Sequence, residues 1–208
     1  MNKKTNKIIS QEEMRSLENF NRTLLNSKES FCLDLFLFSF YTGGFSLGDI
    51  ACLKREDIGN AKLNSERFKY PLLNSISLNE KAISIINKYE NQSDESYVFP
   101  IFTHKYNTST QRKNQIKRLA YKINKVLHKA SDVVNIENRH LTWETAKYTF
   151  IMKLFEEKRH PKAIYSFAGI TALAVESYLY EQESPSEREA REKKLREDMN
   201  RIFCRKKQ

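Results

Sequence analysis

The sequence predicts a mainly α-helical domain with a small antiparallel β-hairpin, which places it in the α+β class. Only five glycines and four prolines interrupt 208 residues, and so few turn residues favour long helices over a many-stranded fold. Apolar residues recur at helical spacing along most of the chain, whereas strand-like alternation is confined to residues 67–78. Because 39% of the residues are apolar, the chain can build one real core, which argues against intrinsic disorder.

The elements follow one another with recognisable start and stop signals. Ser10 with Glu13 forms a capping box at the first helix, and the glycine pair at 43–44 ends the second. The spacing predicts helices over residues 10–25, 30–41, 47–53 and 80–89, within 103–131, over 142–158, from Pro161 onward, over 172–179 and in a tail beyond Pro185. Two short strands are expected at 67–71 and 72–78, and a connector or edge strand at 97–102.

Composition narrows the class of function. Lysine and arginine number 36 against 26 acidic residues, so the net charge is +10 and an anionic partner is expected, with nucleic acid first. The longest apolar run, 33–41, is broken by Asp34 and is too short to span a membrane, and no secretory signal opens the chain. Three scattered cysteines without ligand spacing indicate reduced cytosolic thiols rather than a metal site. We therefore expect a cytoplasmic, nucleoid-associated protein without membrane contact.

The positive charge is concentrated in one segment. Residues 103–131 hold eight lysines and arginines and no acidic residue. On a helix their apolar residues form one stripe, and a second face carries a row of cations: Arg118, Lys122, Lys125 and Lys129. We predict that this face binds the phosphate backbone of double-stranded DNA, while an ordinary solvated helix face is the alternative.

Several strings, in their order along the chain, resemble the catalytic domain of the tyrosine recombinase (phage integrase) family. DLFLFSFYTGGFSLGDIACLKREDI (34–58) is similar to its first block, closest to integrases of conjugative elements of gut anaerobes, and RFKYPLLNSISL (67–78) to its lysine hairpin. LTWETAKYTF (141–150) is similar to the helix with the His-x-x-Arg-His box, and IYSFAGITALAVESYL (164–179) to the segment leading to the nucleophile. The resemblance implies a catalytic-domain-like unit at 1–183 without the family's N-terminal DNA-clamping domain, and a charged amphipathic tail at 184–208.

The resemblance also implies a mechanism. A tyrosine attacks a DNA phosphodiester to form a 3′-phosphotyrosine link, two arginines neutralise the phosphate, and a hairpin lysine protonates the leaving oxygen. Neither a metal nor a nucleotide cofactor is required. On this chain the nucleophile falls on Tyr178 and the general acid on Lys69, and Lys147 takes the place of the second arginine as a phosphate clamp.

The other family positions have changed. Neither candidate position for the first arginine holds one, and the remaining box and Leu-Gly-His positions have lost their histidines; these degenerate positions are Gly43, Ser46, Glu144, Tyr148 and Ile170. Lysine lacks the planar fork of arginine, and a carboxylate at 144 would repel the phosphate. Because one lost donor costs about two to three powers of ten in rate, we expect cleavage to be very weak or absent.

Plainer interpretations stand beside these assignments. Glu144 and Lys147 are spaced as a helix-surface ion pair, and Tyr178 could be a core tyrosine, with Tyr180 as an alternative nucleophile. Arg139 and His140 could replace part of the lost positive charge near DNA or lie unpaired on the surface. The tail is either a solvated helix or a self-association segment with the apolar positions Leu195, Met199, Ile202 and Phe203.

Three functions are therefore distinguished at this stage. The first is a site-specific recombinase for DNA integration that works through Tyr178. The second is an accessory or regulatory DNA-binding protein of the same fold without catalysis, and the third is an interaction domain that does not bind nucleic acid. Trapping of a covalent adduct separates the first two. The third is favoured if replacing Lys69, Lys122 and Lys129 by glutamate leaves the DNA affinity unaltered.

Overall fold

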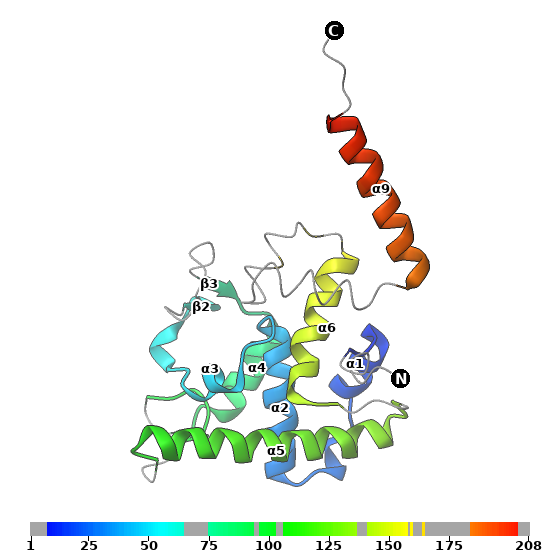
Figure 1. Ribbon diagram of the computed structural model, residues 1–208. Coiled ribbons are helices and arrows are strands. Elements are labelled where there is room, and N and C mark those ends of the chain that lie inside the picture. The colour runs from blue at the N-terminus through cyan, green and yellow to red at the C-terminus, as the bar shows by residue number, and fades with distance from the viewer. Residues whose placement is uncertain are drawn as a thin grey trace. The chain divides into compact units, whose positions relative to one another are not determined.

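The computed structural model describes residues 8–64, 75–93, 96–102, 106–136, 141–157, 159, 164 and 184–203, with side chains as far as 198 (Figure 1). The described α-helices are α1 (Gln11–Glu18), α2 (Ser27–Tyr41), α3 (Leu47–Ala51), α4 (Glu80–Tyr89), α5 (Ser109–Val133), α6 (Trp143–Glu156) and α9 (Pro185–Phe203). The strands are β1 (Ile58–Gly59), β2 (Lys62–Asn64) and β3 (Ser75–Ser77). A mostly helical chain with one small antiparallel sheet confirms the predicted fold class.

The chain divides into two compact units, Met1–Gly169 and Ile170–Gln208. The predicted boundary between residues 183 and 184 falls inside the second unit. In that unit α9 confirms a helix beyond Pro185, and Leu195 on it is 63% exposed. The side chains of Met199, Ile202 and Phe203 lie outside the described residues.

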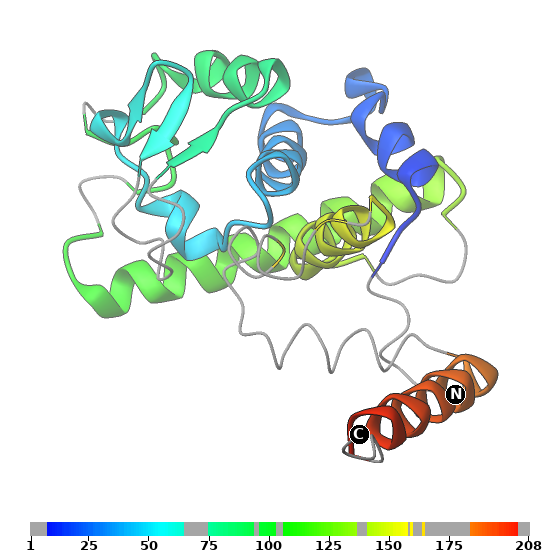
Figure 2. The ribbon, with the colours of Figure 1, turned by 90° about the horizontal axis from the view of Figure 1, so that it is seen from above.

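Helix α2 is the centre of the first unit. All its residues from 32 to 40 are buried. It contacts α4, α5 and α6, and Figure 2 shows it between α4 with the sheet on one side and α5 with α6 on the other. A helix covered on all sides needs apolar residues around its whole circumference, which explains the long apolar run.

The helix starts follow their caps. Ser10 and Glu13 form the predicted capping box of α1, with Glu13 N donating to Ser10 Oγ at 3.1 Å. A second box, Asn26 with Glu29, starts α2 at Ser27, three residues earlier than predicted. The prediction missed it because Asn26 precedes a polar turn in which helical spacing of apolar residues has not yet begun.

The predicted helix over residues 10–25 is wrong in its second half. Helix α1 ends at Glu18, and a separate 3-10 turn, Arg22–Leu24, follows. The Asn21 side chain starts this turn by accepting from Thr23 N at 3.1 Å. Phe20 is buried, but Leu24 is 48% exposed, so the apolar spacing that suggested one continuous helix does not mark one buried face.

The sheet runs in the order β1-β2-β3, with both pairs antiparallel. Only β3 lies within the predicted strands, since the sequence prediction missed β1 and β2. Residues 60 and 61 form the tight turn between those two strands, and Asn60 and Ala61 have φ of 52° and 55°. A type I′ hairpin turn needs positive φ at both central residues, and its usual sequence is Asn-Gly. Because alanine stands at the second position here, the sequence did not indicate the turn.

Helix α5 is the longest described element. Thr108 and Gln111 form its capping box, and Asn135, with φ of 57°, ends it in a left-handed cap. Ile136 N donates to Ser131 O at 2.9 Å across that cap. Thr142 is the N-cap residue of α6 as predicted, but the cap is made by its backbone, since Thr142 N donates to Thr145 Oγ1 at 3.1 Å while its own hydroxyl makes no hydrogen bond to the described residues. The expected strand at 67–71, the helix after Pro161 and the helix at 172–179 lie outside the described residues.

Candidate functional site

The end of α2, the start of α3 and the first turns of α6 meet at one place in the first unit. A Cβ built on Gly44 would lie 2.7 Å from Cα, Cβ and Cγ of Lys147. Asp49, in the first turn of α3, is near enough for its charge to act on Lys147. The structure therefore brings together five predicted positions that are about 100 residues apart in sequence: Gly43, Ser46, Glu144, Lys147 and Tyr148.

The glycine turn that ends α2 has a fixed shape. Gly43 and Gly44 have φ of 83° and 82°, a region that residues with a side chain rarely adopt. Gly44 N donates to Ser39 O at 2.7 Å, and Ser39 Oγ donates to Phe45 O at 2.7 Å. An arginine at position 43 would have to adopt this strained backbone, so the turn disfavours any side chain there.

Ser46 caps α3. Its hydroxyl accepts a hydrogen bond from Asp49 N at 3.1 Å and donates one to Asp49 Oδ2 at 2.6 Å. A neutral hydroxyl engaged in this way supplies no positive charge to a phosphate. The physical role of Ser46 in the described structure is to start a five-residue helix.

Lys147 is a half-buried lysine held against the glycine turn. Burial lowers its pKa below the usual value of 10.5, and the charges of Glu144 and Asp49 act in the opposite direction. The negative charges of Glu144 and Asp49 therefore act on the ammonium, which weakens its attraction for an anion. Glu144 is exposed and Tyr148 is half-buried beside it on α6.

The cations of α5 differ in what they contact. Arg118, Lys122, Lys125 and Lys129 are all exposed, as the helical projection predicted. Lys129 Nζ lies 3.1 Å from Glu29 Oε2 and donates to Leu24 O at 3.0 Å, so it ties α5 to the start of α2. Arg112 is also engaged, since its Nε donates to Tyr106 O at 3.0 Å and its guanidinium lies 5.3 Å from the Phe102 ring centroid.

The remaining predicted site residues are Lys69, Arg139, His140, Ile170 and Tyr178, and all five lie outside the described residues. The segment 65–74 that joins β2 to β3 contains Lys69. Among the residues that are described, no group of three histidine, cysteine or acidic side chains is arranged to hold a metal ion. In the same part of the chain, none of the helices has the length and apolar character needed to cross a bilayer.

Comparison with known proteins identifies the fold. No protein-family model matches the sequence, and a search of curated proteins finds no match. Solved structures do match. XerA recombinase has a TM-score of 0.59 at 14% identity over 97% of this chain, and the Tn1549 transposon integrase with transposon right-end DNA has 0.60 at 13% over 90%. The same integrase with circular intermediate DNA gives 0.55 at 15%. The chain has the tyrosine recombinase catalytic-domain fold.

This chain is shorter than those recombinase structures. It spans 66% of the XerA chain and 65% of the Tn1549 integrase chain in its right-end complex. Identities of 13% to 15% show that the fold persists while most side chains differ. Within this recombinase fold, the site described above lies where α2, α3 and α6 meet.

Sequence reasoning missed a buried polar cluster on the opposite side of α2. Asp34 is 4% exposed, and its carboxylate binds Arg22 at 2.9 Å, Lys88 at 2.6 Å and the Tyr89 hydroxyl at 2.7 Å. An acidic residue inside an otherwise apolar run was the available signal. A buried carboxylate needs such partners, and they come from two elements, the 3-10 turn with Arg22 and helix α4 with Lys88 and Tyr89.

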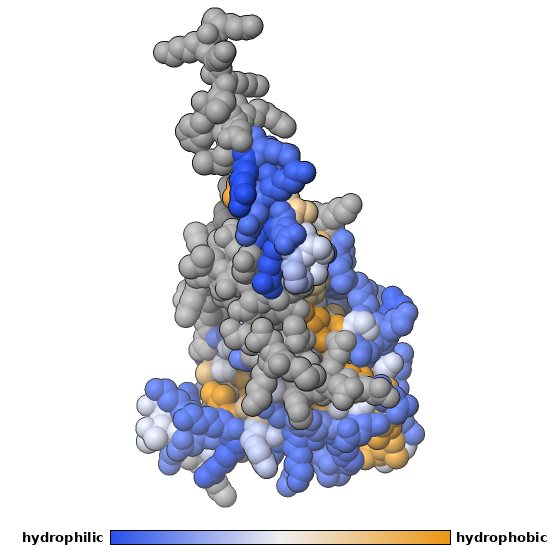
Figure 3. Space-filling model, turned by 45° about the vertical axis from the view of Figure 1, so that its right-hand side comes forward, coloured by the Kyte–Doolittle hydropathy of each residue, from blue (hydrophilic) through white to orange (hydrophobic). Residues whose placement is uncertain are grey.

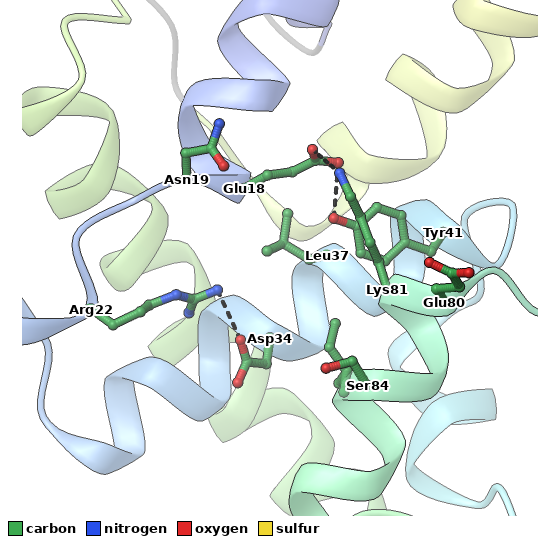
Figure 4. Close-up of a pocket in the computed structure, with 10 residues that line it drawn as sticks. Glu18, Asn19, Arg22, Asp34, Leu37, Tyr41, Glu80, Lys81 and Ser84 are labelled. Atoms are coloured by element: carbon green, nitrogen blue, oxygen red, sulfur yellow. Dashed lines mark hydrogen bonds and ion pairs between the residues drawn. The ribbon is translucent and has the colours of Figure 1, made fainter.

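The pocket of about 360 Å³ next to this cluster lies among α1, α2 and α4 (Figure 4). On one wall Glu18 accepts from the Tyr41 hydroxyl at 2.8 Å and from Lys81 Nζ at 2.5 Å, and on the other Arg22 meets Asp34. Burial, followed by the bond to Glu18, raises the pKa of Tyr41 well above its usual value. These pairs fasten α1 to the core, and no predicted site residue lines the pocket.

Proposed function

We propose that this chain is a DNA-binding protein built on the tyrosine recombinase fold, with strand cleavage very weak or lost. The observation that carries the proposal is the exposed row of cations on α5 that form no hydrogen bond or ion pair with the described residues. Lys113, Lys117, Arg118, Lys122 and Lys125 have no hydrogen bond or ion pair to any residue that the structure describes. When such cations neutralise DNA phosphates, the counterions condensed on the DNA are released, and this release drives binding to the duplex.

The fold supports this choice of partner. The Tn1549 integrase of similar fold was solved with transposon right-end DNA and with circular intermediate DNA. The charge of +10 agrees with an anionic partner. An interaction domain without nucleic-acid binding would leave the exposed cations of α5, which form no ion pair with the described residues, without a function.

Weak or absent cleavage is inferred from the described part of the site. The backbone at Gly43 disfavours any side chain, and the hydroxyl of Ser46 is bound to Asp49. Lys147 shares its surroundings with two carboxylates. Each of these features lowers the positive potential at the site, which would be needed to stabilise the negative charge on a pentavalent phosphorus in the transition state. An accessory or regulatory role in DNA recombination fits this combination better than a working recombinase does.

DNA binding is tested by fluorescence anisotropy with a labelled duplex over a series of salt concentrations. Lys122→Gln and Lys125→Gln should each weaken binding and reduce the slope of log K against log salt by about one. Lys129→Gln combined with Glu29→Gln is the matched control. It removes a neighbouring lysine with its partner, keeps the net charge and should leave the slope unchanged. Equal slopes for all variants would contradict the proposed surface.

Cleavage is tested with a nicked suicide duplex that traps a phosphotyrosine link. We expect no covalent adduct, because none of the described positions assigned to the two arginines holds an arginine. An adduct with the wild-type chain that disappears in Tyr178→Phe would show a working recombinase instead, with Lys69 and Lys147 as its remaining cationic groups. DNA affinity measured on the same preparations separates lost binding from lost chemistry.

A further inference from the structure

One tyrosine of α5 projects into solvent. Tyr121 is 73% exposed, more than the other large apolar and aromatic side chains that are exposed in the described part of the chain. Most aromatic residues of the first unit pack into the core or against it. An exposed phenol among charged side chains contributes little to folding, so its position needs another explanation.

The neighbours of Tyr121 on the helix surface are cations. Lys117 and Arg118 lie one turn before it and Lys125 one turn after it, while Lys122 follows it in sequence and lies about 100° around the helix. We call these five residues the α5 stripe. The stripe from 117 to 125 extends about 12 Å along the helix axis at 1.5 Å per residue, and Tyr121 is at its middle.

The limits of the stripe are set by tertiary contacts. Toward the end of α5, Lys129 is bound to Glu29 and Leu24 O, and toward its start Arg112 is bound to Tyr106 O against the Phe102 ring. Between these two engaged cations the stripe is exposed and forms no hydrogen bond or ion pair with the described residues. Helix α5 lies at the edge of the first unit with one side open to solvent (Figures 1 and 3).

We infer that Tyr121 is a DNA-backbone contact whose hydroxyl donates a hydrogen bond to a phosphate oxygen between the phosphates held by the flanking cations. This inference rests on the proposed DNA-binding function and assigns a residue that charge patterning does not reveal. Hydroxyl groups contribute many of the contacts that position proteins on the duplex backbone. A duplex hides the faces of its bases, so the hydroxyl, rather than stacking of the ring, is the group that duplex DNA can use.

A neutral donor and a cation differ in their response to salt. Replacing a lysine of the stripe lowers the number of counterions released and changes the salt slope. Replacing only the hydroxyl of Tyr121 removes one hydrogen bond to a charged group and leaves the counterions unchanged. Tyr121→Phe should therefore weaken duplex binding by about 5- to 10-fold at every salt concentration, with an unchanged slope.

The experiment compares Tyr121→Phe, Tyr121→Leu and Lys125→Gln by anisotropy on duplex and single-stranded DNA of the same sequence. Tyr97→Phe, a half-buried tyrosine that packs on Phe102, controls for loss of a phenolic hydroxyl elsewhere. Thermal unfolding of each variant checks the fold. The inference is supported if Tyr121→Phe alone among the phenylalanine variants weakens duplex binding with a parallel salt dependence.

Three outcomes overturn it, and they are distinguishable. If Tyr121→Phe binds duplex as the wild type does while Lys125→Gln is weakened, the surface is correct and the tyrosine contact is wrong. If only Tyr121→Leu loses affinity, and mainly for single strands, the ring stacks on unpaired bases instead. If the wild-type chain does not bind DNA, the proposed function fails together with the inference.

Discussion

Gly44, in the turn after α2, lies directly against Lys147 of α6, about 100 positions later in the sequence. A Cβ at position 44 would lie 2.7 Å from Cα, Cβ and Cγ of Lys147, and the backbone there has φ of 82°. The glycine thus lets the end of α2 reach the first turns of α6. This contact assembles the candidate site.

Gly44→Ala should lower the free energy of unfolding by about 2–4 kcal/mol, from left-handed strain together with overpacking against the α6 backbone. Chemical denaturation measures it. Gly59→Ala is the matched control, because nothing lies within 4 Å of a Cβ built there, and a change of at most about 0.5 kcal/mol is expected. Equal effects of the two substitutions would show that the close approach to Lys147 does not matter.

Asp34→Ala should lower the free energy of unfolding by about 2–3 kcal/mol, since the buried Tyr89 hydroxyl would lose its acceptor. Arg22 and Lys88 are exposed enough for water to replace the carboxylate. Urea denaturation compares this variant with Glu56→Ala, which breaks the exposed Lys54–Glu56 pair and should have little effect. A loss no greater than that of Glu56→Ala would refute the stabilising role of the cluster.

Ala61→Gly should stabilise the protein by about 0.5–1 kcal/mol, because relief of left-handed strain exceeds the entropy that glycine adds to the unfolded chain. The backbone at Ala61 has φ of 55° in the turn between β1 and β2. Thermal and urea unfolding provide the measurement. Ala120→Gly, inside α5, should instead destabilise by about 1 kcal/mol. Destabilisation by both changes would argue against strain at this turn.

Lys147→Met should make the protein more stable at neutral pH, and the difference from wild type should shrink as pH rises toward 10.5. Burial lowers the pKa of Lys147 in the folded state, partly offset by Glu144 of α6 and Asp49 of α3. Between the lowered folded pKa and 10.5 the unfolded chain binds more protons, so the stability of the wild type rises with pH. Urea denaturation from pH 7 to 10 tests this. Lys113→Met, on the exposed side of α5, controls for the loss of one positive charge.

A difference between wild type and Lys147→Met that stays constant over this pH range would show that burial does not perturb the lysine. Tyr41 and Tyr89 have pKa values that burial raises above the usual range. Their contribution to stability falls as pH rises through the unfolded tyrosine value. Because both proteins contain these tyrosines, the difference between the two curves cancels that effect.

Local signals were sufficient for much of the fold. The Ser10 box, the glycine pair after α2 and the apolar stripe of α5 predicted their helices because caps and spacing act over a few residues. The same reasoning failed at residues 10–25, where Phe20 is buried and Leu24 is not. It also missed β1 and β2, whose turn contains an alanine where glycine is usual.

The sequence by itself determined the helical class, the cations of α5 and the uncharged residues at Gly43 and Ser46, since residue identity and short-range spacing carry that information. The tertiary structure decided which of these cations are paired with another described residue. Lys129 and Lys125 are one turn apart on the same helix, yet Lys129 is bound to Glu29 and Lys125 is not. Only packing between helices fixes such pairs, because the sequence around a lysine does not indicate a partner about 100 residues away. Packing also placed Lys147 against Gly44, at the site proposed to have lost its chemistry. It left Tyr121 exposed to solvent, on the surface proposed to bind DNA.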